Sequence, residues 1–167
     1  MDNEPITIEW LEWYGDAWRA YESYKKEKAA IESRLGICGI DYSKEHNSSN
    51  KKRLSNQEVF VLKLERLNKE IAECESILFP AKEKLITQIK RIKKANWRKV
   101  LILYYVEKWK LKDIAQDCFW YENDYEIKQD IYLDTVKRWK REAIHQLEEV
   151  SKKPFIEITQ LTLEEAK

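Results

Sequence analysis

The amino-acid sequence predicts an all-α protein with two parts and a tail. Gly and Pro number only three each and charged residues make up 37% of the chain, and such scarcity of turn formers favours helices. Residues 1–94 carry two apolar seams with the spacing of a coiled coil, which predicts a long helical hairpin. Three short amphipathic segments follow in residues 95–150. Residues 151–167 form a C-terminal tail.

The first long helix is expected to begin at Ile8 and to end near Gly36. Its seam residues follow one another at steps of three and four, as in a heptad repeat: Tyr14, Ala17, Tyr21, Tyr24, Lys28, Ile31 and Leu35. Residues 40–54 are rich in Ser, Asn and Lys, which indicates a surface loop that links two helices.

The second long helix is expected to begin at Ser55, which forms a capping box with Glu58. Its seam has the same spacing, at Phe60, Leu64, Leu67, Ile71, Cys74 and Leu78. Pro80 lacks a backbone donor, so the helix should stop or kink near Leu78, and a separate helix should run from Ala81 to about Lys94.

The two seams fit an intramolecular hairpin or a homodimer through the N-terminal helices, and the spacing leaves both open.

Residues 97–147 predict three further helices. The first buries Val100, Leu103, Tyr104 and Val106, and a polar break at 108–110 follows it. The second begins with Leu111, Ile114 and Ala115. The third begins near Leu133 and repeats apolar residues at helical spacing, namely Val136, Trp139, Ala143, Ile144 and Leu147. Three short helices, the last of them basic, are typical of a helix-turn-helix unit. In such a unit the last helix can bind in the major groove of DNA.

Two segments of this unit, LILYYVEKWKLKDIAQ and TVKRWKREAIHQL, carry a family resemblance. Residues 95–148 resemble the C-terminal helix-turn-helix of sigma factors, their region 4. More narrowly, they look like the ArpU-type late regulators of phages and prophages of Gram-positive bacteria. The resemblance implies a transcriptional regulator that binds double-stranded DNA sequence-specifically. This chain departs from the family in an insert of about eleven residues without Gly, at 119–130, between the second and third helices.

The charge distribution agrees with a nucleic-acid partner. The net charge is only +1, but residues 81–118 hold eleven Lys and Arg against four Asp and Glu. Residues 119–134 hold one basic residue against five acids, and residues 135–153 hold six against three. A basic module interrupted by an acidic insert is therefore expected, and basic side chains supply affinity by neutralising phosphates.

Helix geometry assigns seven side chains to DNA contact: Thr135, Lys137, Arg138, Lys140, Arg141, Lys110 and Lys112. Thr135, Arg138 and Arg141 on the third helix would face base edges or nearby phosphates, and Lys137 and Lys140 flank them. The two lysines at the start of the second helix could bind backbone phosphates. Trp139 is expected to pack in the core. The aromatic residues of the insert either pack on the module or contact a partner such as RNA polymerase through Trp120 and Tyr121.

Other classes of protein find little support in the sequence. Cys38, Cys74 and Cys118 are widely spaced, which argues against a zinc site or a disulfide framework and favours reduced thiols in the cytoplasm. No apolar run suggests export or a membrane partner. No catalytic or cofactor motif occurs, and the acids of the insert lack the ligand order of a Ca²⁺ loop. We therefore expect no enzyme, no cofactor and no metal.

Two alternatives to a regulator stay open. One is a DNA-packaging recognition subunit, similar to a small terminase, in which the helix-turn-helix is joined to an oligomerising coil. The other is a helical protein-binding adaptor without DNA contact. Ring assemblies would favour the first, and absence of salt-dependent DNA affinity would favour the second.

Overall fold

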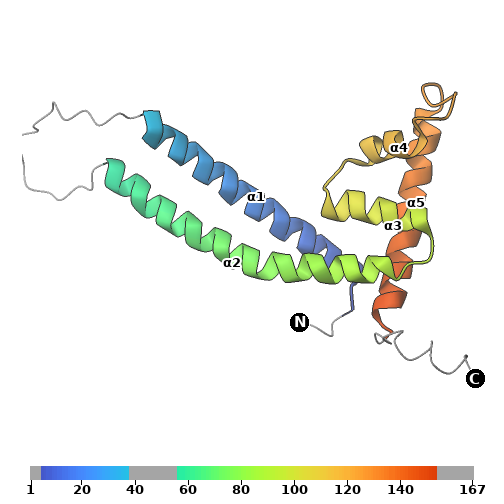
Figure 1. The fold of residues 1–167 in the computed structure, drawn as a ribbon, viewed down its shortest axis with the longest axis horizontal. Coiled ribbons are helices and arrows are strands. Elements are labelled where there is room, and N and C mark those ends of the chain that lie inside the picture. The colour runs from blue at the N-terminus through green and yellow to red at the C-terminus, as the bar shows by residue number, and fades with distance from the viewer. Residues whose placement is uncertain (1–4, 38–55, 154–167) are drawn as a thin grey trace, which may run out of the picture. The chain divides into compact units, whose positions relative to one another are not determined.

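The structure is a computed structural model that describes residues 5–37 and 56–153, and within these residues it is entirely helical. The elements are α1 (Ile8–Ile37), α2 (Asn56–Lys90), α3 (Ala95–Leu101), the π-helical turn η1 (Ile102–Val106), α4 (Leu111–Phe119) and α5 (Gln129–Ser151) (Figure 1). The all-α prediction is confirmed. The expected loop at 40–54, Ser55 and the tail beyond residue 153 lie outside the described residues. No described helix is both long and apolar enough to cross a membrane.

The chain divides into two compact units. One consists of residues 13–81, and the other combines residues 1–12 with residues 82–167. The sequence places its boundary between residues 94 and 95, whereas this division falls within α1 and α2. The last turns of α2 therefore belong to the same unit as α3, α4 and α5.

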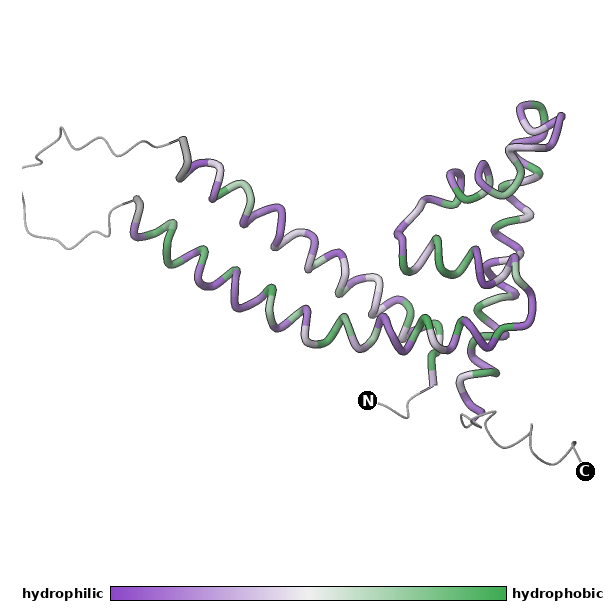
Figure 2. Tube along the Cα trace, viewed as in Figure 1, coloured by the Kyte–Doolittle hydropathy of each residue, from purple (hydrophilic) through white to green (hydrophobic). Residues whose placement is uncertain are grey.

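The unit of residues 13–81 contains most of α1 and most of α2, which run side by side in opposite directions (Figure 1). Apolar and polar residues alternate along both helices (Figure 2). Polar contacts between them include the Tyr21 hydroxyl, which donates to Glu75 Oε1 over 2.7 Å, and Lys63 Nζ, which lies 2.6 Å from Glu27 Oε1. The buried residues of this unit are positions that the seams predict, Tyr14, Tyr21, Ile31, Leu67 and Leu78.

Of the two outcomes expected near Leu78, a stop or a kink of the second helix, the stop is wrong. Helix α2 continues through Pro80 to Lys90, so residues 81–90 are its last turns and not a separate helix. Pro80 removes the bond to the carbonyl of Ser76, which costs about 3 kcal/mol in a helix interior. Both residues are exposed, so water can bind that carbonyl, and Leu78, Leu85 and Ile89 are all buried on the helix around it.

In the second unit, α3 and α4 pack against α5, and η1 contacts α3 and α4 (Figure 1). Val100, Ile114, Ala115 and Val136 form the core and are at most 1% exposed. Partly buried side chains surround it, namely Leu103, Tyr104, Leu111, Cys118, Phe119 and Trp139. The chain start is tied to the end of α5, because the backbone N–H of Ile6 donates to Ser151 Oγ and that of Ile8 to Glu148 Oε1, each over 3.0 Å.

The turn between η1 and α4 lies at the predicted polar break. Lys108 adopts the left-handed conformation, with φ of 62°, where a helix end usually places Gly. The backbone N–H of Trp109 then donates to Leu103 O over 2.9 Å. A non-Gly residue in this conformation costs about 1–2 kcal/mol, so the packing of η1 and α4 must hold the turn.

Replacing Ile114 by Ala should lower the free energy of unfolding by about 2–5 kcal/mol, because the cavity would lie at the contact of α4 and α5. Ile131→Ala is the matched control, since Ile131 is 61% exposed and should change stability by less than about 0.5 kcal/mol. Chemical denaturation followed by circular dichroism measures both. Equal effects would contradict the described core.

Candidate nucleic-acid interface

The core fixes which face of α5 is exposed. Val136, Ala143 and Leu147 are fully buried, and their spacing of seven and four residues places them on one side of the helix. Arg138 and Arg141 lie away from that side and are exposed. The helix begins at Gln129 and not near Leu133 as expected, because the end of the predicted insert adds a first turn to α5.

Three predicted DNA contacts lie together on the exposed side of α5. No described residue forms an ion pair with Arg138 or Arg141. Lys137 Nζ lies 2.8 Å from Asp134 Oδ1, and both side chains are exposed. An exposed pair contributes about 0–1 kcal/mol, so an incoming phosphate can replace Asp134.

Two other predicted contacts on α5 are engaged within the unit. The Thr135 hydroxyl donates to Ile131 O over 2.9 Å, which is a bond inside the helix. Lys140 is half-buried, and its Nζ lies 3.6 Å from the ring centroid of Tyr104. This cation–π contact attaches α5 to η1. The structure therefore does not bring Thr135 and Lys140 to the open surface with Arg138 and Arg141.

Lys110 and Lys112, the two predicted contacts near the start of α4, are both exposed. Lys112 lies in an acidic environment. Lys110 precedes the helix and Lys112 lies in its first turn. Lys112 lines a groove of about 680 Å³ whose other wall is the turn after α4. Glu122 and Glu126 line the same groove, so Lys112 faces a region of opposite charge.

The turn at residues 120–128 packs partly against α5. Phe119 and Tyr125 contact the ring of Tyr132, and the Phe119 and Tyr132 rings stack with centroids 4.5 Å apart. The Phe119 ring also lies 5.4 Å from the ring of Trp139. The Tyr132 hydroxyl donates to Asp124, which also pairs with Lys128. Two of the four aromatic residues of the insert, Phe119 and Tyr125, therefore pack on the module as the first interpretation expects.

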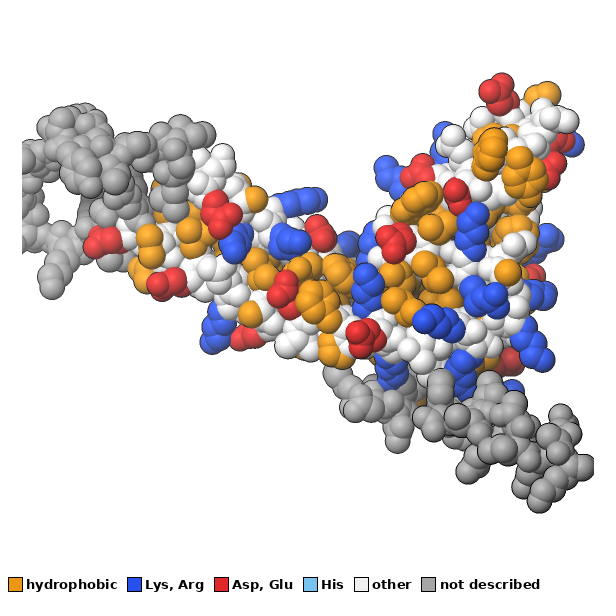
Figure 3. All heavy atoms as spheres, viewed as in Figure 1, with side chains coloured by type: hydrophobic (Ala, Val, Ile, Leu, Met, Phe, Trp, Pro, Cys, Tyr) orange, Lys and Arg blue, Asp and Glu red, His pale blue; other side chains and the backbone are white. Residues whose placement is uncertain are grey.

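Other apolar side chains of this turn are open to solvent. Trp120 is 71% exposed, Tyr121 62% and Ile127 86%. Acidic and hydrophobic side chains share the surface at this end of the unit (upper right in Figure 3). This surface fits the second interpretation, contact with a protein partner, which exposed aromatic residues favour.

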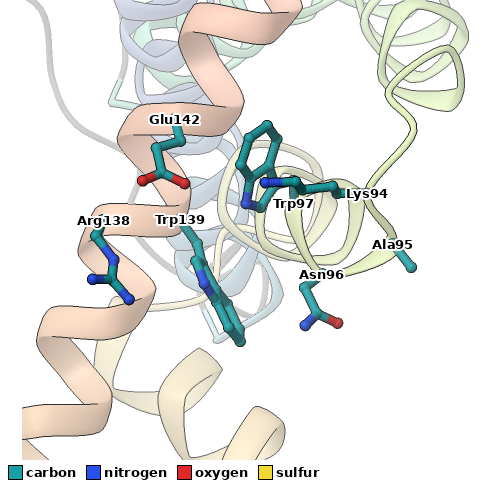
Figure 4. A pocket seen from close by; sticks show the side chains of 7 residues that line it. All are labelled: Lys94, Ala95, Asn96, Trp97, Arg138, Trp139 and Glu142. Atoms are coloured by element: carbon teal, nitrogen blue, oxygen red, sulfur yellow. The ribbon is translucent and has the colours of Figure 1, made fainter.

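A second groove contains residues that the sequence interpretation did not assign to DNA. It measures about 430 Å³ and lies between α5 and the turn that joins α2 to α3 (Figure 4). Arg138, Trp139 and Glu142 line it from α5, and Lys94, Asn96 and Trp97 from the other side. The only signal in the sequence was the excess of basic residues in 81–118, which does not say that Lys94 approaches Arg138.

The described residues contain no group of metal ligands and no reactive thiol. No three His, Cys, Asp or Glu among them are grouped as metal ligands. Cys74 and Cys118 are free thiols, and burial raises the pKa of each. A raised pKa keeps a thiol protonated and therefore unreactive at neutral pH.

Comparison with protein-family models, with curated proteins and with solved structures finds no significant match to this chain.

The contact between Asp124 and Tyr132 should appear in a pH titration. The hydrogen bond to Asp124 raises the pKa of Tyr132 from its usual 10.0 to about 12, and bonds from Lys128 and Tyr132 lower the pKa of Asp124. The contact should thus persist from the pH at which Asp124 ionises up to about 12. Asp124→Asn should return the pKa of one tyrosine toward 10.0 in ultraviolet absorbance.

Asp134→Asn is the control for that titration, because Asp134 pairs with Lys137 and not with a tyrosine. Its titration curve should match that of the unaltered protein. Identical curves for the unaltered protein and Asp124→Asn would contradict the described anchoring of the turn.

Proposed function

We propose that this protein is a transcriptional regulator of phage or prophage type that binds double-stranded DNA sequence-specifically. In this proposal α3 with η1, α4 and α5 form a sigma-region-4-like helix-turn-helix, and α5 is the recognition helix. The observation that carries it is the exposed pair Arg138 and Arg141 on the side of α5 opposite its buried residues. The resemblance of residues 95–148 to sigma-like regulators supports the same function.

The chemistry of this pair suits a DNA groove. A guanidinium group presents fixed donors that pair in a bidentate way with guanine or with a phosphate. A bidentate contact with the correct base is worth about 1–3 kcal/mol of discrimination. Lys137 adds a positive charge beside the pair, and a helix such as α5 fits the width of the major groove.

We further propose that α1 and α2 form a hairpin through which two copies associate. Val59, Val61 and Leu62 near the start of α2 are between 46% and 52% exposed. Apolar surface of this kind gains free energy when a partner covers it. A dimer would present two recognition helices to two half-sites on DNA.

Replacing both Arg138 and Arg141 by Ala should abolish specific DNA binding, because it removes two potential base contacts and two positive charges. Each bidentate contact is worth about 1–3 kcal/mol, so the joint loss should exceed tenfold. A duplex selected from a random pool by the unaltered protein is the probe, and a mobility-shift titration is the measurement. Helix content should not change, since both side chains are exposed.

The matched control is Lys25→Ala with Lys26→Ala, which removes the same charge from exposed positions on α1. It should retain binding to the selected duplex. If the Arg138/Arg141 variant shifts the duplex as the unaltered protein does, these residues do not read DNA.

A protein-binding adaptor is the second candidate, and the exposed Trp120, Tyr121 and Ile127 favour it. The two candidates differ in their response to salt. A regulator loses DNA affinity steeply as salt rises, because bound phosphates release counterions. An adaptor should show no binding to duplex DNA even at low salt.

A further inference from the structure

The groove beside Arg138 contains the donors that a phosphate requires. Lys94 supplies an ammonium group, Asn96 an amide N–H₂ and Arg138 a guanidinium. All three are exposed and line one groove, so an oxyanion can reach them from solvent. Figure 4 shows Lys94 and Asn96 on one wall and Arg138 on the facing helix.

Lys94 is held in place by its neighbours. Its Nζ lies 3.8 Å from the centroid of the Trp97 ring, which limits the freedom of the side chain. Lys94 is exposed, unlike the half-buried Lys140, so a phosphate can reach its ammonium group from solvent. The backbone of the turn is fixed by Arg98, whose Nη1 donates to Ile92 O over 2.6 Å and to Lys93 O over 3.0 Å. A donor that is ordered before binding loses less entropy when the ligand arrives.

The groove at Lys94 and Arg138 and the groove at Lys112 have opposite electrostatic character. Lys112 shares its groove with Glu122 and Glu126, and a phosphate there would meet two carboxylates. In the other groove, Lys94 and Arg138 face the single carboxylate of Glu142. A polyanion is therefore repelled from the turn after α4 and attracted to the turn before α3.

We propose that the groove formed by Lys94, Asn96 and Arg138 binds a backbone phosphate of the DNA duplex. The bound DNA then runs from the middle of α5 toward the turn between α2 and α3, and away from the acidic turn after α4. This inference rests on the proposed DNA-binding function and specifies which side of α5 carries the backbone contact. It assigns to Lys94 the phosphate role that the sequence suggests for Lys112.

Three single substitutions test the assignment, and each is expected to change DNA affinity or its salt dependence in a different way. Lys94→Ala should weaken binding several-fold and reduce the slope of log affinity against log salt by about 0.9, the value for one lost phosphate contact. Glu142→Gln should strengthen binding, because it removes the one acid of the groove. Lys112→Ala should leave the slope unchanged, although it removes the same charge as Lys94→Ala.

The measurement is fluorescence anisotropy of a labelled mixed-sequence duplex titrated with the full chain between about 50 and 200 mM salt. Lys94→Arg should keep the slope, since the charge remains, which separates phosphate binding from a structural effect of the position. Circular dichroism should show the same helix content in every variant, because the altered side chains are all exposed.

Each result has a distinct meaning. If the unaltered protein shows no salt-dependent binding, the proposed DNA-binding function fails and this inference fails with it. If the unaltered protein binds but Lys94→Ala keeps the full slope, the function stands and the groove is not a phosphate site. A reduced slope in Lys112→Ala alone would place the DNA backbone at the start of α4 instead.

Discussion

The arrangement of the second unit depends on the burial of four small or branched side chains, Val100, Ile114, Ala115 and Val136. They come from three helices, Val100 from α3, Ile114 and Ala115 from α4 and Val136 from α5, and none is more than 1% exposed. Individually these segments are short: α3 spans seven residues and α4 nine. Helices of that length are marginal in water without tertiary packing. The core therefore both stabilises α3 and α4 and sets the rotation of α5, which determines that Arg138 and Arg141 face solvent.

The turn after α4 is acidic, whereas the turn before α3 is basic, so the unit carries opposite charges at two places on its surface. The acidic turn at residues 120–128 is attached to α5 by the ring of Tyr132, which contacts Phe119 and Tyr125. At the other end, Arg98 holds the turn before α3 and leaves Lys94 exposed beside Arg138. Because both turns are anchored by specific contacts, their charges occupy fixed positions relative to α5. A net charge of +1 thus conceals a strong local asymmetry.

Two backbone features show tertiary packing overriding local preference. Pro80 does not end α2, because apolar residues are buried on the helix before and after it. Lys108 adopts a conformation that Gly would adopt at lower cost. From the sequence alone, Pro80 and the segment 108–110 interrupt the helical pattern. The preference of a single residue does not show whether the burial of distant side chains outweighs the cost of an unfavourable conformation. Tertiary contacts also accompany the start of α5 at Gln129, since Tyr132 in its first turn stacks on Phe119 and Tyr125.

The sequence by itself determined that the described chain is helical and which side of each long helix is apolar. It also identified Val136 and Ala143 as core residues and Arg138 and Arg141 as exposed ones, because helical periodicity is a local property that spacing records directly. Only the tertiary structure decided that Lys140 lies on Tyr104, that Lys112 faces Glu122 and Glu126, and that Lys94 lies across a groove from Arg138. These arrangements join residues from different helices and turns. Their geometry depends on how helices pack, and the spacing of residues within one helix does not contain that information.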